Sequence, residues 1–172
     1  HKVLEVETPM LSLSTVTDVN FLAFKTCYSS ISHRKKKTLW LITSPEYHMK
    51  RLLSANSGPI YQICHSFRNS EFGKYHNPEF TMLEWYQPFY SMHDLIKEVD
   101  IFLQYILGCK KSNKISYQDI FIKHLNIDPL STNISEIRQK SKELQLEYLT
   151  DREKKLEKLI ELLFLCKVEP NI

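Results

Sequence analysis

The sequence predicts an α+β protein in which an antiparallel sheet comes first and helices follow. Alternating and β-branched residues dominate residues 1–90, a pattern typical of strands. Over residues 91–172 the apolar residues recur at helical spacing instead. The chain has 172 residues, 42% of them hydrophobic, which is enough for one compact core or for part of a larger one. We therefore expect a single domain, or part of one, with a sheet portion and a helical portion.

The first strands are predicted from short apolar runs. VLEVETP, at residues 3–9, alternates apolar and acidic residues and ends at Pro9, which cannot donate a ladder hydrogen bond. LSLSTVTDVNFLAF, at residues 11–24, is expected to be a polar loop followed by a short apolar run. LWLIT, at residues 39–43, is expected to be a buried strand.

A helix and a hairpin come next. In SPEYHMKRLLSANSG, Ser44 can cap a helix, Pro45 suits its first position and Gly58 follows its end. Two strands are then predicted at 60–68 and 79–86. The segment NSEFGKYHNP joins them, so we expect an antiparallel hairpin with a long loop, and such loops are often functional.

The helical portion is predicted from amphipathic spacing. SMHDLIKEVDIFLQYILG is expected to form a helix that Gly108 ends. SYQDIFIKHLN is a shorter helix with Ser116 as its cap, and SEIRQKSKELQ and DREKKLEKLIELLFL are two further helices. One stripe of the first helix is expected to lie in the core: Leu95, Val99, Phe102, Leu103 and Ile106.

Charge and cysteine usage narrow the function classes. The net charge is only +3, weaker than is usual for a nucleic-acid binder. HRKKK, at residues 33–37, is the one dense basic run, and a solvated loop tip is favoured there over a phosphate-binding patch. The cysteines form no CxxC pair, so we expect a reduced, cytoplasmic protein without zinc or disulfides: Cys27, Cys64, Cys109 and Cys166.

No apolar run is long enough to cross a bilayer, so no membrane association is expected. The chain begins at His1 with residues that already resemble a strand, and it ends at VEPNI without a helix stop signal. We therefore expect it to be a piece of something longer, or a degraded copy of it.

The two faces of the predicted hairpin suggest a binding surface. Period two places Gln62, Cys64, Ser66 and Arg68 on one face of the first strand, and Phe80, Met82, Glu84 and Tyr86 on one face of the second. If these faces coincide, a cation beside a ring would suit a nucleotide, and a carboxylate beside a phenol would suit an ammonium ion. The alternative is structural: Arg68 could pair with a neighbouring glutamate, and Glu84 could be an ordinary edge position.

FRNSEFGKYHNPEFTMLEWY, at residues 67–86, resembles motif 2 of class II aminoacyl-tRNA synthetases of the lysyl type. VLEVETPML resembles the end of motif 1, and TSPEYHMKRLL lies between the two as in that family. The sequence of these three segments is most similar to the subfamily of ligases that attach (R)-β-lysine to elongation factor P. IDPLS and VEPNI also resemble that subfamily, so the similarity extends nearly to Ile172.

The resemblance implies an incomplete class II catalytic sheet and an ATP-dependent ligase that forms an aminoacyl-adenylate with Mg²⁺ and passes it to elongation factor P. Arg68 would hold the α-phosphate and Phe80 would stack on adenine. Further ATP contacts would come from Asn69, Ser70 and Asn77. Lysine or β-lysine would bind to Ser44, Pro45, Glu46, Glu84 and Tyr86.

Each of these implied roles has a plain alternative. Ser44-Pro45-Glu46 could be only a helix start, because a first-turn glutamate gains about 0.3–1 kcal/mol from the helix dipole. His76 is favoured as a loop residue that holds its neighbours rather than as a base. The resemblance makes Pro9 part of a homodimer interface, and the alternative is an edge proline.

The sequence departs from the family pattern twice. Motif 2 of the family carries Arg-x-Glu, but Ser70 stands at the glutamate position and Glu71 follows it. The glycine-rich motif 3, with its arginine, is absent, and the only glycines are Gly58, Gly73 and Gly108. Three functions stay open: the ligase, a lysyl-tRNA synthetase fragment that charges tRNA, and an inactive truncated remnant.

Overall fold

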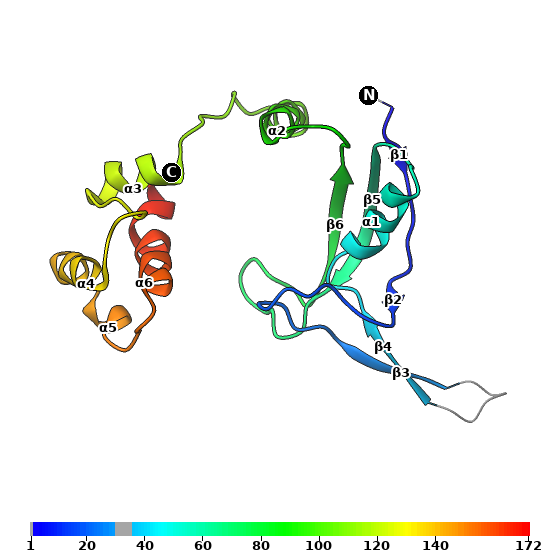
Figure 1. The fold of residues 1–172 in the computed structure, drawn as a ribbon, viewed down its shortest axis with the longest axis horizontal. Helices are drawn as coiled ribbons and strands as arrows, with labels where there is room; N and C mark the ends of the chain where they lie inside the picture. Colours follow the sequence, from blue (N-terminus) through cyan, green and yellow to red (C-terminus); the bar gives the residue numbers. More distant parts are fainter. Residues whose placement is uncertain (1, 30–35) are drawn as a thin grey trace. The chain divides into compact units, whose positions relative to one another are not determined.

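The structure, a computed structural model, describes residues 2–29 and 36–172 (Figure 1). It contains two compact units, His1–Ile106 and Leu107–Ile172, and each is considered by itself below. The first unit holds all the strands of the described residues and two helices, and the second is helical. The predicted mixture of strands followed by helices is therefore present.

The first sheet is the one that carries the predicted hairpin. Its strand order is β1 (Leu4–Glu5), β5 (Ile60–Phe67) and β6 (Glu79–Tyr86). β5 and β6 pair antiparallel along their whole length, as predicted, although β5 ends at Phe67 rather than at Arg68. β1 runs parallel to β5 and pairs over two residues only, so the expectation of a wholly antiparallel sheet with a strand over 3–9 is wrong. Beyond the paired residues, the Val6 N–H still donates to the Tyr61 carbonyl at 2.9 Å, and the Thr8 hydroxyl donates to Gln62 Oε1 at 2.9 Å.

The second sheet differs from the sequence prediction. Its order is β2 (Leu11–Ser12), β4 (Lys36–Leu41) and β3 (Lys25–Ser29), all antiparallel. The strand predicted at 39–43 is only partly right: β4 begins three residues earlier and ends at Leu41, its last three residues are half-buried, and the buried Ile42 and Thr43 follow it. β2 and β3 were not predicted, because every residue of β3 is exposed and its polar sequence carries no alternating apolar pattern.

The basic run HRKKK lies partly outside the described residues. Lys36 and Lys37 belong to β4 and are exposed, whereas residues 33–35 are not described. The prediction of a solvated loop tip is therefore open for those three residues.

Helix α1 (Glu46–Ser54) begins one residue later than predicted. Pro45 occupies the cap position, and the Ser44 hydroxyl accepts a hydrogen bond from the Glu46 N–H at 3.2 Å. The helix ends before Asn56, whose left-handed φ of 61° stops it two residues ahead of Gly58. Asn tolerates this conformation because its short polar side chain can hydrogen-bond locally.

Helix α2 (Met92–Leu107) ends before Gly108, as predicted, and Gly108 has a φ of 62°. Its apolar stripe, however, is not core: Leu95 and Phe102 are each 39% exposed and Val99 is half-buried. Between this stripe and the sheet lies an apolar cavity of about 390 Å³, and Trp85 reaches Phe102 across 6.0 Å between ring centroids. The core prediction for α2 is wrong because this cavity, rather than packed side chains, lies between part of the stripe and the sheet.

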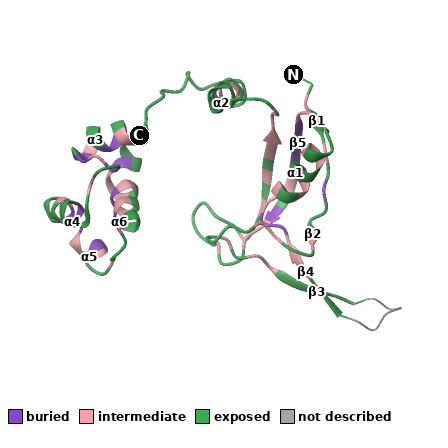
Figure 2. Cartoon of the chain, viewed as in Figure 1, coloured by how far each residue is buried: buried purple, intermediate pink, exposed green. Residues whose placement is uncertain are grey.

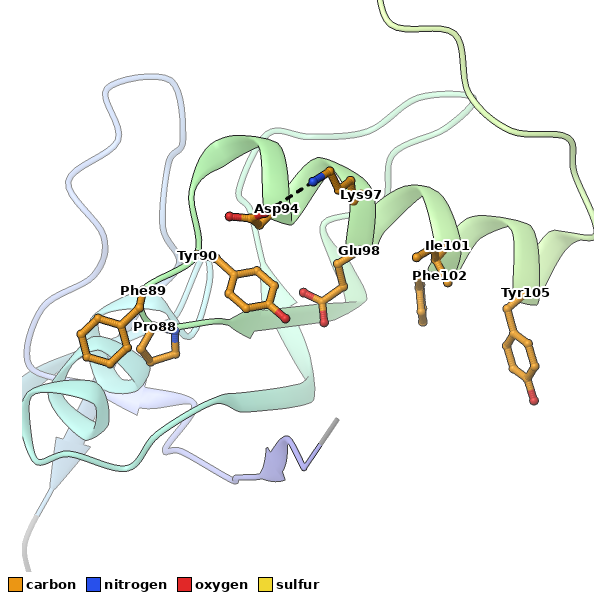
Figure 3. Close-up of a pocket in the computed structure, with 9 residues that line it drawn as sticks. All are labelled: Pro88, Phe89, Tyr90, Asp94, Lys97, Glu98, Ile101, Phe102 and Tyr105. Atoms are coloured by element: carbon orange, nitrogen blue, oxygen red, sulfur yellow. Dashed lines mark ion pairs between the residues drawn. The ribbon is translucent and has the colours of Figure 1, made fainter.

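A second and wider hollow, of about 1060 Å³, also lies along α2 and shares Glu98 and Phe102 with the first (Figure 3). Phe89, Tyr90 and Tyr105 contribute rings to it, and Lys97 forms an ion pair with Asp94 at its rim. Both hollows leave α2 with an apolar surface that the first unit does not cover.

The second unit packs α3 (Tyr117–Leu125), α4 (Ile134–Glu143), α5 (Glu147–Thr150) and α6 (Leu156–Leu163), followed by a π-helical turn at Phe164–Val168 and a 3₁₀ turn at Glu169–Asn171. Ser116 caps α3 as predicted, accepting from the Asp119 N–H at 3.0 Å. Figure 2 shows the buried positions on the inner sides of these helices. They form one cluster: Ile120, Phe121, Leu125, Ile127, Ile137, Leu146, Leu159, Leu163 and Val168. Along the described residues, no helix combines the length and apolar character needed to cross a membrane.

The cluster predicts that Leu159→Ala destabilises the second unit by about 2–5 kcal/mol, since Leu159 is fully buried and truncation leaves a cavity. Leu130→Ala is the matched control, because Leu130 is 75% exposed, and it should change the stability by less than about 0.5 kcal/mol. Urea unfolding followed by far-ultraviolet circular dichroism measures both. Equal losses for the two variants would contradict this packing.

Candidate functional site

The site is built on the ladder between β5 and β6. The register pairs Gln62 with Glu84 and Ser66 with Phe80, so the predicted faces of the two strands coincide. Gln62 and Ser66 are buried on this face, with 1% and 0% of their surface exposed. Arg68 follows Phe67, the last residue of β5, and its N–H donates to the Pro78 carbonyl at 2.9 Å, which extends the ladder by one step. The cation, the rings and the carboxylate predicted for this face therefore lie together.

The Arg68 guanidinium lies between two aromatic rings. Its Cζ is 5.0 Å from the centroid of Phe80 and 3.7 Å from the centroid of Phe21. Its Nε donates to the Thr43 carbonyl at 3.4 Å, and its Nη1 is 3.9 Å from the Glu71 carboxylate. The side chain is only 19% exposed. Arg68 thus shows features of both alternatives. Its guanidinium lies beside aromatic rings, as the binding surface requires, and it also approaches a neighbouring glutamate, as the structural alternative requires.

Phe21 is a residue that sequence reasoning missed. It belongs to the segment between β2 and β3, which bonds to the hairpin where the Asn69 N–H donates to the Leu22 carbonyl at 2.7 Å. Thr17, at the start of the same segment, bonds to the Tyr47 hydroxyl at 2.6 Å and so ties it to α1. Nothing in the sequence indicated that Phe21 contacts Arg68, because Phe21 is only an aromatic residue in a short apolar run.

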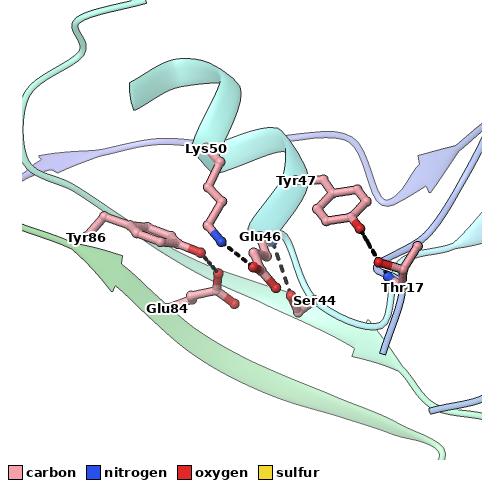
Figure 4. Close-up of polar contacts among 7 residues, drawn as sticks. All are labelled: Thr17, Ser44, Glu46, Tyr47, Lys50, Glu84 and Tyr86. Atoms are coloured by element: carbon pink, nitrogen blue, oxygen red, sulfur yellow. Dashed lines mark hydrogen bonds and ion pairs between the residues drawn. The ribbon is translucent and has the colours of Figure 1, made fainter. Parts of the chain in front are cut away.

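A second group of side chains lies further along the same face (Figure 4). The Tyr86 hydroxyl donates to Glu84 Oε1 at 2.6 Å, and Lys50 and Glu46 of α1 form an ion pair beside them. Ser44 bonds to the Glu46 N–H, and Pro45 is buried behind it. The residues that the resemblance assigns to the amino acid are therefore brought together by α1 and β6.

The electrostatics of this group favour a neutral phenol. Burial raises the pKa of Tyr86 well above its usual range, and the hydrogen bond to Glu84 and the charges of Glu84 and Glu46 raise it further. Burial likewise raises the pKa of the neighbouring Cys64 thiol, so that this cysteine stays protonated and unreactive at neutral pH. Two carboxylates, a neutral phenol and a lysine ammonium are thus the charged and polar groups of this end of the face.

The remaining predicted residues lie in the loop between the strands or away from it. Asn69, Ser70 and Asn77 are exposed, and Ser70 has a left-handed φ of 70°. Gly73 and His76 bond to each other through their backbones at 3.0 and 3.3 Å, so His76 helps to close the loop. Pro9 is exposed between β1 and β2.

A family model described as tRNA synthetases class II (D, K and N) matches residues 1–164. Two curated relatives are named elongation factor P--(R)-beta-lysine ligase. The protein from Buchnera aphidicola subsp. Acyrthosiphon pisum (strain APS) is 65% identical over 170 residues, which are 99% of this chain and 52% of that protein. The protein from Buchnera aphidicola subsp. Schizaphis graminum (strain Sg) is 60% identical over 169 residues, which are 98% of this chain and 52% of that protein. The motif-based resemblance is confirmed, and the chain spans about half the length of the curated relatives it matches.

The polar group predicts a measurable change in the pKa of Tyr86. Glu84→Gln should lower that pKa, because a neutral amide no longer repels the phenolate, yet the pKa should stay above its usual value because burial is the larger cause. Titration of the tyrosine ¹³Cζ signals by NMR measures it. Glu79→Gln is the matched control, since Glu79 lies on the other face of β6 beside His65. A Tyr86 pKa that Glu84→Gln leaves unchanged would contradict the arrangement.

Proposed function

The chain belongs to the class II tRNA synthetase family (D, K and N), and from this premise we propose that it binds ATP and a lysine-type amino acid for adenylate formation. We further propose that the amino acid is (R)-β-lysine and that the acceptor is a lysine of elongation factor P. The curated relatives carry this activity in their names. Because the chain spans about half the length of those relatives, its activity, substrates and partners are proposals.

One observation carries the proposal: the guanidinium of Arg68 and the ring of Phe80 lie 5.0 Å apart on one face, with Glu84 further along it. A fixed cation suits the α-phosphate, a ring suits the base, and a carboxylate suits the ammonium. Along the ladder Arg68 comes first, Phe80 lies beside it and Glu84 lies further on, so the nucleotide and the ammonium would bind at different ends of one face. Transfer to tRNA remains the second candidate from the family alone, but the names of the relatives favour the protein acceptor.

The first step needs positioning more than covalent chemistry from the protein. An oxygen of the substrate carboxylate attacks the α-phosphorus of ATP, the bond to the bridging oxygen breaks, and pyrophosphate leaves. Arg68 neutralises the negative charge that builds on the α-phosphate oxygens, and Phe80 holds the adenine. Glu84, Glu46 and Tyr86 hold the ammonium so that the carboxylate faces the phosphate. The acceptor amine then attacks the acyl carbon, and AMP leaves.

The carboxylate missing from the Arg-x-Glu pattern has a candidate replacement in Glu71. The left-handed conformation of Ser70 turns the backbone at this point, and the Glu71 carboxylate approaches Arg68 to 3.9 Å. We propose that Glu71 recognises ATP in place of the residue at position 70. Asn69, Ser70 and Asn77 stay proposed ATP contacts from the exposed loop.

Mg²⁺ is proposed to reach the site on the phosphates of ATP, since Mg²⁺ usually binds through substrate phosphates with few protein carboxylates. Of the protein groups near Arg68, the Glu71 carboxylate is the one whose chemistry fits a hard cation. Across the residues that the structure describes, no group of three or more His, Cys, Asp or Glu side chains is placed to hold a metal. A homodimer with Pro9 at its interface, in the cytoplasm, completes the proposal.

Arg68→Ala should weaken ATP binding by about 10- to 100-fold, because a charged hydrogen-bond partner contributes about 1.5–3 kcal/mol. Isothermal titration of the full chain with ATP measures this loss. Arg51→Ala is the matched control, because Arg51 is exposed on α1 and should leave the affinity unchanged. An Arg68→Ala variant with wild-type affinity would contradict the proposed phosphate site.

Phe80→Leu should distinguish the contribution of the adenine base to ATP binding from the contribution of the phosphates. It should weaken ATP by about 5- to 100-fold, since stacking contributes about 1–3 kcal/mol per base. Inorganic tripolyphosphate should be bound within about threefold of wild type, because Phe21 still stacks on Arg68. Phe89→Leu, at a fully exposed ring, is the control for both titrations. Parallel losses for the two ligands would show that Phe80 only positions Arg68 and does not hold adenine.

A further inference from the structure

Lys50 places an ammonium group of the chain itself at the proposed amino-acid pocket. It lies one helical turn after Glu46, and its Nζ bonds to Glu46 Oε1 on the side of α1 that faces Glu84 and Tyr86 (Figure 4). The hydrogen bond to Glu46 is the main reason that the pKa of Lys50 is raised, and the charges of Glu46 and Glu84 raise it further. The lysine ammonium therefore experiences both carboxylates that are proposed to hold the substrate.

A pair four residues apart on a helix is common and by itself has no functional meaning. Here the second carboxylate comes from β6 rather than from the helix, and its neighbour Tyr86 stays protonated as a donor to Glu84. The Lys50 side chain is also 56% exposed, so its ammonium has direct access to solvent when it leaves Glu46. Glu46 is 32% exposed and stays behind on the first turn of α1.

We propose that Lys50 is a built-in competitor for the substrate ammonium: it occupies the pocket between Glu46 and Glu84 until an incoming ammonium displaces it. This inference rests on the proposed function and adds a residue that sets its amino-acid affinity. With Lys50 in place, two carboxylates and one ammonium leave a single negative charge, which one substrate ammonium neutralises. Without it, the pocket would carry two negative charges and would bind a dication more strongly.

The test uses 1,5-diaminopentane, a probe with two ammonium groups and no carboxylate, titrated into the full chain and followed by NMR. Lys50→Met keeps the length of the side chain and removes its charge, and it should raise the affinity about tenfold, as expected for removing a like charge within a few ångströms. Lys50→Arg keeps the charge and should stay within about twofold of wild type. In the wild type, the ¹⁵Nζ signal of Lys50 should shift as the probe binds.

Lys158→Met is the matched control. Lys158 is 55% exposed and pairs with Glu161 at 2.6 Å on α6. Its substitution changes the net charge by the same amount as Lys50→Met, so the affinity of this variant for the probe should equal that of wild type. Equal or weaker binding by Lys50→Met would overturn the inference and leave the proposed function standing. An absence of binding by every variant would overturn the inference and the ammonium pocket together. The ATP titrations of Arg68→Ala and Phe80→Leu would still report on the nucleotide half independently.

Discussion

The register of the β5–β6 ladder is the constraint on which the site depends. Ser66 opposite Phe80 puts Arg68 and the ring on one face, and Gln62 opposite Glu84 puts the ammonium pocket on the same face. A slip of one residue in either strand would send these side chains to opposite faces and leave no shared site. The ladder is held beyond its last pair by the bond from the Arg68 N–H to Pro78, and the Phe67 N–H donates to Ile42 at 2.9 Å. Backbone bonds thus fix the register at the end where the nucleotide is proposed to bind.

The sequence predicted this hairpin well because both strands are rich in aromatic and aliphatic residues and the polar segment between them contains Gly73 and Pro78. β6 was predicted at its observed bounds, and period two predicted the residues of each face, but only the observed register shows that the two faces coincide. Phe21 could not be found in this way, because its contact with Arg68 joins segments 47 residues apart in the chain and no local pattern encodes it. The α2 stripe was wrongly predicted as core for a related reason: periodicity reports which side of a helix is apolar, not whether another element covers it. β3 was missed because its exposed, polar sequence carries no such pattern.

Both units bury polar as well as apolar side chains. The second unit buries one apolar cluster together with Ser141 and Thr150, whose hydroxyls donate to the backbone carbonyls four residues earlier. In the first unit, the buried side chains include polar ones on the site face, Gln62 and Ser66 among them, and the Gln62 Nε2 has no hydrogen-bond partner in the structure. An unpaired buried donor costs about 1–3 kcal/mol. Its position opposite Glu84 in the ladder places this cost at the floor of the proposed ammonium pocket, where unsatisfied polar groups are common in binding sites.

The mixture of charges and rings in the hairpin has a physical reason. A guanidinium that is fixed by carboxylates loses the positive field that a phosphate needs, whereas a guanidinium stacked between rings keeps it. Arg68 is held mainly in the second way, with Phe21 at 3.7 Å and Phe80 at 5.0 Å, and its nearest carboxylate, Glu71, approaches only to 3.9 Å. The ammonium end of the face is built in the opposite manner. It carries the carboxylates of Glu46 and Glu84, the protonated phenol of Tyr86, and the Lys50 ammonium that we propose the substrate displaces. One end of the face therefore presents the positive charge of Arg68, which no close carboxylate neutralises. The other end presents the negative charges of Glu46 and Glu84. A nucleotide phosphate beside an amino-acid ammonium requires this arrangement of charge.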